Sequence, residues 1–265
     1  MKYPQRPARP HTPRPARPQA GETVVGLRAG LAVFARRPSD VMRVVHSRAV
    51  RSDVVDLARW AKREGVPCDE VADAELDRFA GSSHHEGLCL EVRPRQWGTP
   101  RDLGEALTRR RGVAVALDRV RNPYNVGAIL QSAAFFGLEG ALFGAQAPHP
   151  ELAPTAVRVA EGGVEHLLLA RTTDLSSTLS NLRKAGVRVV GADGQATASA
   201  TGFAFGRPTI LVLGHEREGL GERVRAQCDA MVAVRGSGRI ESLNVGVAAG
   251  VLIAEMTRGA SGLPG

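Results

Sequence analysis

The sequence predicts an α/β protein whose larger, C-terminal part is built on a mostly parallel β-sheet. Six short apolar runs lie between residues 112 and 234 and alternate with helix-like segments. Continuous apolar runs are typical of parallel strands that helices cover on both faces, and this alternation favours a parallel sheet. Three of the runs pass directly into segments rich in Gly, Asn, Ser or Glu. In open α/β sheets, ligands bind at the carboxyl ends of the strands.

Composition limits the classes of protein that fit. A chain of 265 residues with 43% hydrophobic residues has room for one large or two modest domains. No apolar run approaches the roughly 20 residues that cross a bilayer, and the N-terminus lacks the apolar segment of a signal peptide. We therefore expect a cytoplasmic protein without a membrane partner. The three widely spaced cysteines have no metal-ligand spacing, so we expect buried, reduced thiols and no metal site.

The first 20 residues carry five of the eight net positive charges and no acidic residue. This stretch is rich in Pro and poor in apolar residues, which predicts a disordered arm over residues 1–20. Its cations suit contacts with RNA phosphates, although a purely solubilising tail is the alternative.

Residues 22–93 are predicted to form a small α/β domain, followed by a linker over 94–110. In chain order, we expect a helix over 23–36, a strand over 41–46, a helix over 50–64, a strand over 66–71, a helix over 74–80 and a strand over 87–92. Two Pro and one Gly in the segment PRQWGTPRDL (94–103) indicate the linker.

Residues 111–260 are predicted to form the second domain. Its strands are expected at 112–118, 140–144, 166–170, 187–192, 209–214 and 230–234. Its helices are expected at 125–137, 151–160, 173–185 and 243–257.

Three motifs follow strands of this second domain. In LDRVRNPYNVGAIL (117–130), Asp118 ends a strand, Asn125 can cap the next helix and Gly127 permits close backbone approach. In LVLGHEREGL (211–220), two glycines bracket a charged loop, and about 30 residues later SLNVGVAAG (242–250) opens a helix. From the residue types alone, the first motif is equally well explained as a capped strand-to-helix turn and as a ligand-binding loop.

In this order, the three motifs resemble the signature of the SpoU (TrmH-type) 2′-O-ribose methyltransferases of the SPOUT superfamily, over roughly residues 22–258. The resemblance implies a C-terminal trefoil knot and an N-terminal substrate-binding domain like some ribosomal proteins, with HHEGL (84–88) at a family turn. It also implies S-adenosyl-L-methionine as the methyl donor, rRNA or tRNA as the substrate, and a homodimer whose active sites lie near the subunit interface.

The resemblance further implies two sets of site residues. The catalytic set is Asn125, Gln131, Glu216, Ser242 and Asn244. The donor-binding set is Leu213, Gly214, His215, Glu216, Gly219, Val234 and Leu243. A carboxylate such as that of Glu216 is favourable beside a sulfonium and can also hold an Arg in place.

The chain departs from the family pattern at Gln131, where the family usually has an Arg that is proposed to activate the ribose 2′-hydroxyl. A neutral amide does not accept the proton usefully, although it can orient the hydroxyl. Arg119, Arg121 and Arg158 are possible replacements. The alternative function is therefore an RNA-binding homologue with little or no catalysis.

Two further features of the sequence bear on the resemblance to the SpoU family. Gly246 replaces the usual Ser of the third motif, and a Gly there can allow close packing of a neighbour. The segment RVAEGGVEHL (158–167) resembles a SpoU subgroup, in which Glu161 is either an acid of the site or a helix-end charge. A dinucleotide-binding Rossmann domain fits poorly, because no GxGxxG follows the first strand of a βαβ unit.

Overall fold

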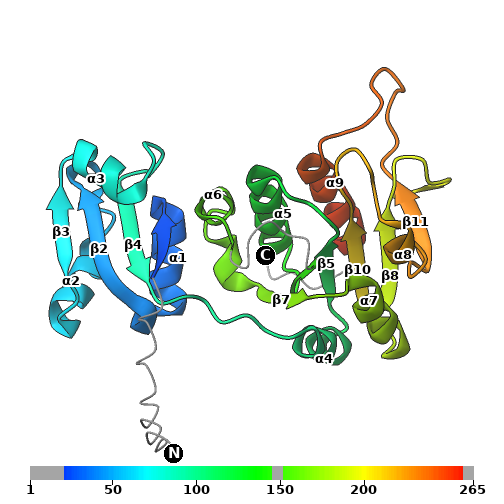
Figure 1. Cartoon of the computed structure of the whole chain (residues 1–265), viewed down its shortest axis with the longest axis horizontal. Coiled ribbons are helices and arrows are strands. Elements are labelled where there is room, and N and C mark those ends of the chain that lie inside the picture. Colours follow the sequence, from blue (N-terminus) through cyan, green and yellow to red (C-terminus); the bar gives the residue numbers. More distant parts are fainter. Residues whose placement is uncertain (1–20, 145–151, 259–265) are drawn as a thin grey trace, which may run out of the picture.

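The computed structural model describes residues 21–144 and 152–258, which form two α/β units joined by the segment after strand β4 (Figure 1). The predicted basic arm over residues 1–20 lies outside the described residues. Among the described helices, none combines the length and the apolar character that a membrane span requires.

The N-terminal unit is a four-stranded sheet in the order β1-β4-β2-β3. Strand β2 pairs parallel with β3, and β4 pairs antiparallel with both β1 and β2. The strands are β1 (Glu22–Val25), β2 (Val41–Ser47), β3 (Cys68–Val71) and β4 (Leu88–Val92). The helices are α1 (Leu27–Arg36), α2 (Val55–Glu64) and α3 (Asp73–Ala80), with short 3₁₀ helices η1 (Pro38–Asp40) and η2 (Arg48–Val50).

Two sequence-based expectations were wrong in this part of the chain. The first residues of the helix expected over 23–36 form strand β1 instead, because its β-branched residues pair with β4. Gly26, at a φ of 112°, then turns the chain into α1. Helix α4 (Pro100–Arg110) lies inside the expected linker. Its Pro occupies the first helical turn, where proline is tolerated, and Thr99 and Asp102 form a capping box.

The C-terminal unit confirms the predicted parallel sheet. Its seven strands run in the order β7-β6-β5-β10-β8-β11-β9, and every neighbouring pair is parallel. The strands are β5 (Val113–Leu117), β6 (Gly140–Gly144), β7 (Leu168–Thr172), β8 (Arg188–Ala192), β9 (Ala198–Ser199), β10 (Thr209–Leu213) and β11 (Ala230–Ala233). The helices are α5 (Pro123–Phe135), α6 (Pro154–Val159), α7 (Leu175–Lys184), α8 (Glu222–Arg225) and α9 (Val245–Thr257), with the 3₁₀ helix η3 (Gly163–His166). The sequence did not suggest β9 or α8, both of which are very short.

The sheet is covered on both faces, which explains its uninterrupted apolar strands. In β5, Val113, Val115 and Leu117 pack in the core that contains α5, α6 and α9. The intervening Ala114 and Ala116 pack in the core that contains α4, α7 and α8. Leu117 is the register partner of Leu213, so β5 and β10 end side by side. The trefoil knot stays a prediction.

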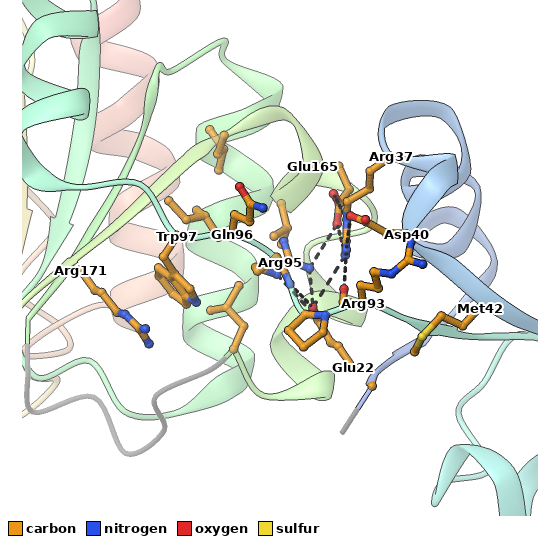
Figure 2. A pocket seen from close by; sticks show the side chains of 16 residues that line it. Glu22, Arg37, Asp40, Met42, Arg93, Arg95, Gln96, Trp97, Glu165 and Arg171 are labelled. Atoms are coloured by element: carbon orange, nitrogen blue, oxygen red, sulfur yellow. Dashed lines mark hydrogen bonds and ion pairs between the residues drawn. The ribbon is translucent and has the colours of Figure 1, made fainter. Parts of the chain in front are cut away.

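A buried cluster of four charges ties the two units together (Figure 2). Arg95, after β4, contacts Glu22 at 2.9 Å and Glu165 of η3 at 3.1 Å, and Arg37 contacts Glu165 at 2.9 Å. Their side chains are only 6–14% exposed. These residues line a cavity of about 1220 Å³, beside which the Arg171 guanidinium lies 5.2 Å from the centre of the Trp97 ring. We call Glu22, Arg37, Arg95 and Glu165 the interdomain ion cluster.

The three cysteines are free thiols, as expected, but only Cys89 is fully buried. Burial raises the pKa of Cys89 to about 12 and, as the largest of several causes, raises that of Cys228 to about 11. Both thiols therefore stay protonated and weakly nucleophilic near neutral pH. The described residues contain no cluster of His, Cys, Asp and Glu suited to a metal ion.

Candidate functional site

Side chains from all three motifs meet in one chain of hydrogen bonds. Asn125, 7% exposed in the first turn of α5, donates through Nδ2 to Oε1 of Glu216 at 2.5 Å. Its Oδ1 accepts a hydrogen bond from Nδ2 of Asn244 at 2.9 Å. Glu216 and Asn244 lie 91 and 119 positions after Asn125 in the sequence. We call Asn125, Glu216 and Asn244 the motif cluster.

The orientation of each amide in this cluster is fixed by the backbone. Asn244 is the N-cap of α9, where its Oδ1 accepts from the backbone N–H of Gly246 at 2.9 Å and of Val247 at 3.3 Å. Because Oδ1 is occupied by these donors, Nδ2 must face Asn125. The Asn125 amide group then presents its own donor to the Glu216 carboxylate.

The expected capping role of Asn125 was wrong. The N-cap of α5 is Asn122, whose side chain accepts from the backbone N–H of Tyr124 at 2.9 Å. Pro123 stands in the first turn, where its missing N–H costs nothing. The shift of three residues leaves the Asn125 side chain available for the cluster.

The loop of the second motif is closed on itself by two glycines. His215 and Gly219 exchange backbone hydrogen bonds of 3.1 and 2.9 Å, and Gly219 has a φ of 66°. A Cβ on Gly214 would lie 2.4 Å from the carbonyl carbon of Gly219, so only glycine fits there. His215 accepts from the backbone N–H groups of Arg217 and Glu218, both at 3.3 Å, which orients its ring within the loop.

The other predicted donor-side residues lie at strand ends or in the loop before α9. Leu213 is buried at the end of β10, and half-buried Val234 directly follows β11. Leu243 is 43% exposed, and Ser242 beside it is also exposed. No hydrogen bond joins the Ser242 side chain to another described residue. The loop that carries them projects beyond the sheet between β11 and α9 (Figure 1).

Gln131 does not join the motif cluster. It is exposed and lies two helical turns beyond Tyr124, on the face that also carries Phe135. Six residues along a helix place it about 120° around the axis from Asn125. Tyr124 is 57% and Phe135 82% exposed, so Gln131 lies between two exposed aromatic side chains.

Packing explains the glycines of the first and third motifs. A Cβ on Gly127 would lie 2.6 Å from Cβ of Val159, so its close approach is to α6 rather than to a ligand. A Cβ on Gly246 would lie 3.2 Å from Cβ of Ala128 and 3.1 Å from Oδ1 of Asn244. Helices α5 and α9 therefore pack closely at Gly246, the position where the resemblance leads us to expect Ser.

The remaining charged residues singled out from the sequence have other contacts. Glu161 pairs with Arg28 of α1, which gives it a contact between the two units rather than a place in the motif cluster. The Arg158 side chain lies against Gly26, and Arg121 is exposed. At the HHEGL turn, His85 is buried and accepts from the backbone N–H of Gly87 at 2.9 Å, as expected for a turn residue.

The chain matches two protein-family models. One, described as the SpoU rRNA Methylase family, matches residues 112–254, and the other, described as RNA 2'-O ribose methyltransferase substrate binding, matches residues 23–98. A protein from Mycobacterium avium named "Uncharacterized tRNA/rRNA methyltransferase" is 34% identical over 254 residues, which cover 92% of this chain and 80% of that protein. A protein of the same name from Mycobacterium ulcerans is 35% identical over 255 residues, with the same coverage of each chain.

Solved structures share the fold. The SpoU methyltransferase AviRb from Streptomyces viridochromogenes, in complex with the cofactor AdoMet, superposes with a TM-score of 0.73 at 23% identity and covers 90% of each chain. An AdoMet-bound rRNA methyltransferase from Sinorhizobium meliloti gives a TM-score of 0.73 at 22% identity, over 89% of this chain and 86% of that one.

Proposed function

The chain belongs to the SpoU methylase family, and from this premise we propose that it transfers the methyl group of S-adenosyl-L-methionine to a ribose 2′-hydroxyl of RNA. The main observation in support of the proposal is the motif cluster. It joins the charged loop that follows β10 to the N-termini of α5 and α9. A donor loop linked in this way to the acceptor side suits a group transfer between two bound molecules.

The residues present fit the proposed methyl donor. A Cβ on Gly219, Gly236 or Gly238 would meet nothing within 4 Å, so the backbone of both loops borders open space that a ligand can approach. When bound, the donor supplies an electrophilic methyl group on a sulfonium, whose charge is favourable near the Glu216 carboxylate. The predicted donor-side residues, from Leu213 to Gly219 with Val234 and Leu243, would line this space.

On the acceptor side, Asn125, Ser242 and Asn244 would hold the ribose. The oxygen–methyl bond forms as the sulfur–methyl bond breaks, and the hydroxyl proton leaves to a base or to water. Glu216 already accepts a hydrogen bond from Asn125, which fixes the amide that faces the RNA. We assign RNA binding to residues 22–93 and methyl transfer to residues 111–260, with rRNA or tRNA as the substrate class, in line with the matched substrate-binding model.

We expect calorimetry with S-adenosyl-L-methionine, or with its demethylated product, to show one site per chain. Gly214→Ala should abolish this binding, because the added Cβ would lie 2.4 Å from the Gly219 backbone. Gly194→Ala is the matched control, since a Cβ there meets nothing within 4 Å and its binding should equal that of the wild type. Wild-type protein that binds no donor at millimolar concentration would contradict the enzymatic function and leave the RNA-binding alternative.

We also propose a homodimer, supported by an exposed apolar surface on the adjacent helices α5 and α9. Val247 is 56% and Val251 39% exposed on α9, and the helix that packs against it, α5, carries the exposed Tyr124 and Phe135. Isolated exposed apolar residues are normal, but a contiguous set marks an interaction surface. In the proposed dimer, a second copy would cover this surface and Gln131 with it.

Val251→Glu should convert the dimer to monomers, because an unpaired carboxylate would be buried in the apolar contact. Light scattering coupled to size-exclusion chromatography measures the mass directly. Val55→Glu is the control, since Val55 is 37% exposed on α2 of the other unit and should leave the mass unchanged. A monomeric wild type, or a dimer that tolerates Val251→Glu, would contradict this interface.

A further inference from the structure

Arg119 links the first motif to the loop of the second motif. It follows β5 with a φ of 61°, a left-handed conformation that is uncommon for a residue other than glycine. Its Nη1 donates to Oε2 of Glu218 at 2.5 Å, and its Nη2 donates to the carbonyl oxygen of Gly219 at 3.1 Å. The Arg119 side chain is 21% exposed, so the guanidinium is largely enclosed by the loop that it contacts.

The preceding residue, Asp118, ties the two ends of the same loop to β5. Its backbone N–H donates to the carbonyl oxygen of Leu213 at 2.8 Å, where β10 ends and the loop begins. Its carboxylate accepts from the backbone N–H of Gly221 at 2.8 Å, where the loop ends and α8 is about to start. Two successive residues therefore anchor residues 214–221 at the start, near the tip and at the end.

This arrangement argues against Arg119 as a replacement for the Arg absent at position 131. Its two terminal nitrogens already donate to Glu218 and Gly219, and its Nε lies 3.5 Å from the Asp118 carboxylate. Glu216, two residues before Glu218 in the loop, bonds to Asn125 instead. A strained backbone that persists only through such contacts is a reason to assign a function to them.

We propose that Arg119 is a positioning residue that holds the loop 214–219 in the conformation that binds the methyl donor. The inference rests on the proposed function, because it assigns the loop to the donor. A protein whose binding-competent loop is only partly populated shows a donor affinity reduced by that fraction. Loss of Arg119 should therefore weaken donor binding, and saturating donor, which populates the loop conformation again, should restore the contact of Glu216 with Asn125.

The test compares donor affinity, RNA affinity and rate in four variants of the full chain. Arg119→Ala should weaken binding of S-adenosyl-L-methionine by roughly tenfold, because a smaller fraction of the protein would hold the loop in the binding conformation. Arg119→Gly should weaken it equally, although it relieves the left-handed backbone, and Arg119→Lys should recover part of the affinity through Glu218. Arg101→Ala, which removes an exposed arginine of α4, is the matched control and should bind the donor as the wild type does.

The rate distinguishes positioning from proton transfer. For a positioning residue, saturating donor restores the wild-type rate in Arg119→Ala, and RNA affinity is unchanged throughout. The proposal is overturned if Arg119→Ala binds the donor as tightly as the wild type, if its rate stays low at saturating donor, or if donor and RNA affinity fall together with thermal stability. Wild-type protein that binds no donor would instead refute the proposed function on which the inference rests.

Discussion

Replacing Gln131 by Arg should raise methyl transfer to RNA by about 10²- to 10⁴-fold, the usual contribution of a well-placed acid–base group. A ribose hydroxyl is a poor nucleophile while it is protonated, and an amide side chain does little to remove the proton. Position 131 is exposed, so the longer side chain can be accommodated without disturbing the core. A mass-spectrometric map of ribose methylation in RNA treated with each protein measures the change.

The proposed homodimer adds a second test of this prediction. Within one subunit, Gln131 lies on the exposed face of α5 with Tyr124 and Phe135, away from Asn125. In the proposed homodimer, an arginine there would act at the face that the second copy covers. The gain from Gln131→Arg should therefore disappear in the Val251→Glu background, while donor binding persists.

Other outcomes for this substitution identify other mechanisms. A wild type that is already active, and that loses activity on Gln131→Arg, would show that the chain uses a different group and that the new cation repels it. If neither protein methylates RNA while both bind the donor, the RNA-binding function gains support and Gly246 becomes the next position to restore. Asn125→Ala should abolish whatever activity exists without weakening donor binding. Full activity in that variant would contradict the assigned acceptor side.

The sequence predicted the sheet well because each of its longer strands carries its own signal. The six apolar runs became β5, β6, β7, β8, β10 and β11, with ends shifted by at most a few residues. Strand β1 was mistaken for the start of a helix, because its four residues pair with a strand more than 60 positions later. Helix α4 was mistaken for a linker, because Pro94, Gly98 and Pro100 each suggest a chain break. Pro100 instead stands at the helix start, and a Cβ on Gly98 would lie 2.9 Å from the Leu168 side chain.

The candidate site shows the same limit more strongly. Local pattern indicated the three motifs whose side chains meet in the motif cluster, but it gave Asn125 the capping role that belongs to Asn122. The hydrogen bonds of the motif cluster connect residues about 100 positions apart, and no local pattern specifies them. The interdomain ion cluster gave no sequence signal at all, since its four charges come from four separate segments and each resembles an ordinary surface residue.

Glu165→Gln should lower the free energy of unfolding by about 3–5 kcal/mol, the usual cost of removing one partner from a buried ion pair. Glu165 is the most buried member of the interdomain ion cluster, at 6% side-chain exposure, and it contacts both Arg37 and Arg95. Burial lowers the pKa of Arg37, but the contacts with Glu165, Glu22 and Asp40 together outweigh it, so the net pKa is raised and the guanidinium stays charged. Without Glu165, two buried cations would share Glu22 as their remaining partner within the cluster.

Urea unfolding followed by circular dichroism measures this loss, with Glu105→Gln as the matched control. Glu105 pairs with Arg101 on α4, where the two side chains are 57% and 85% exposed, and exposed pairs of this kind contribute about 0–1 kcal/mol. The double variant Glu165→Gln/Arg95→Gln should recover part of the loss, because it restores the balance of charge in the cluster. Equal stability of Glu165→Gln and Glu105→Gln would show that water reaches the cluster and that it does not hold the two units together. If the predicted loss is found, weaker RNA binding at unchanged donor affinity should accompany it, because the cluster joins the proposed RNA-binding unit to the proposed methyl-transfer unit.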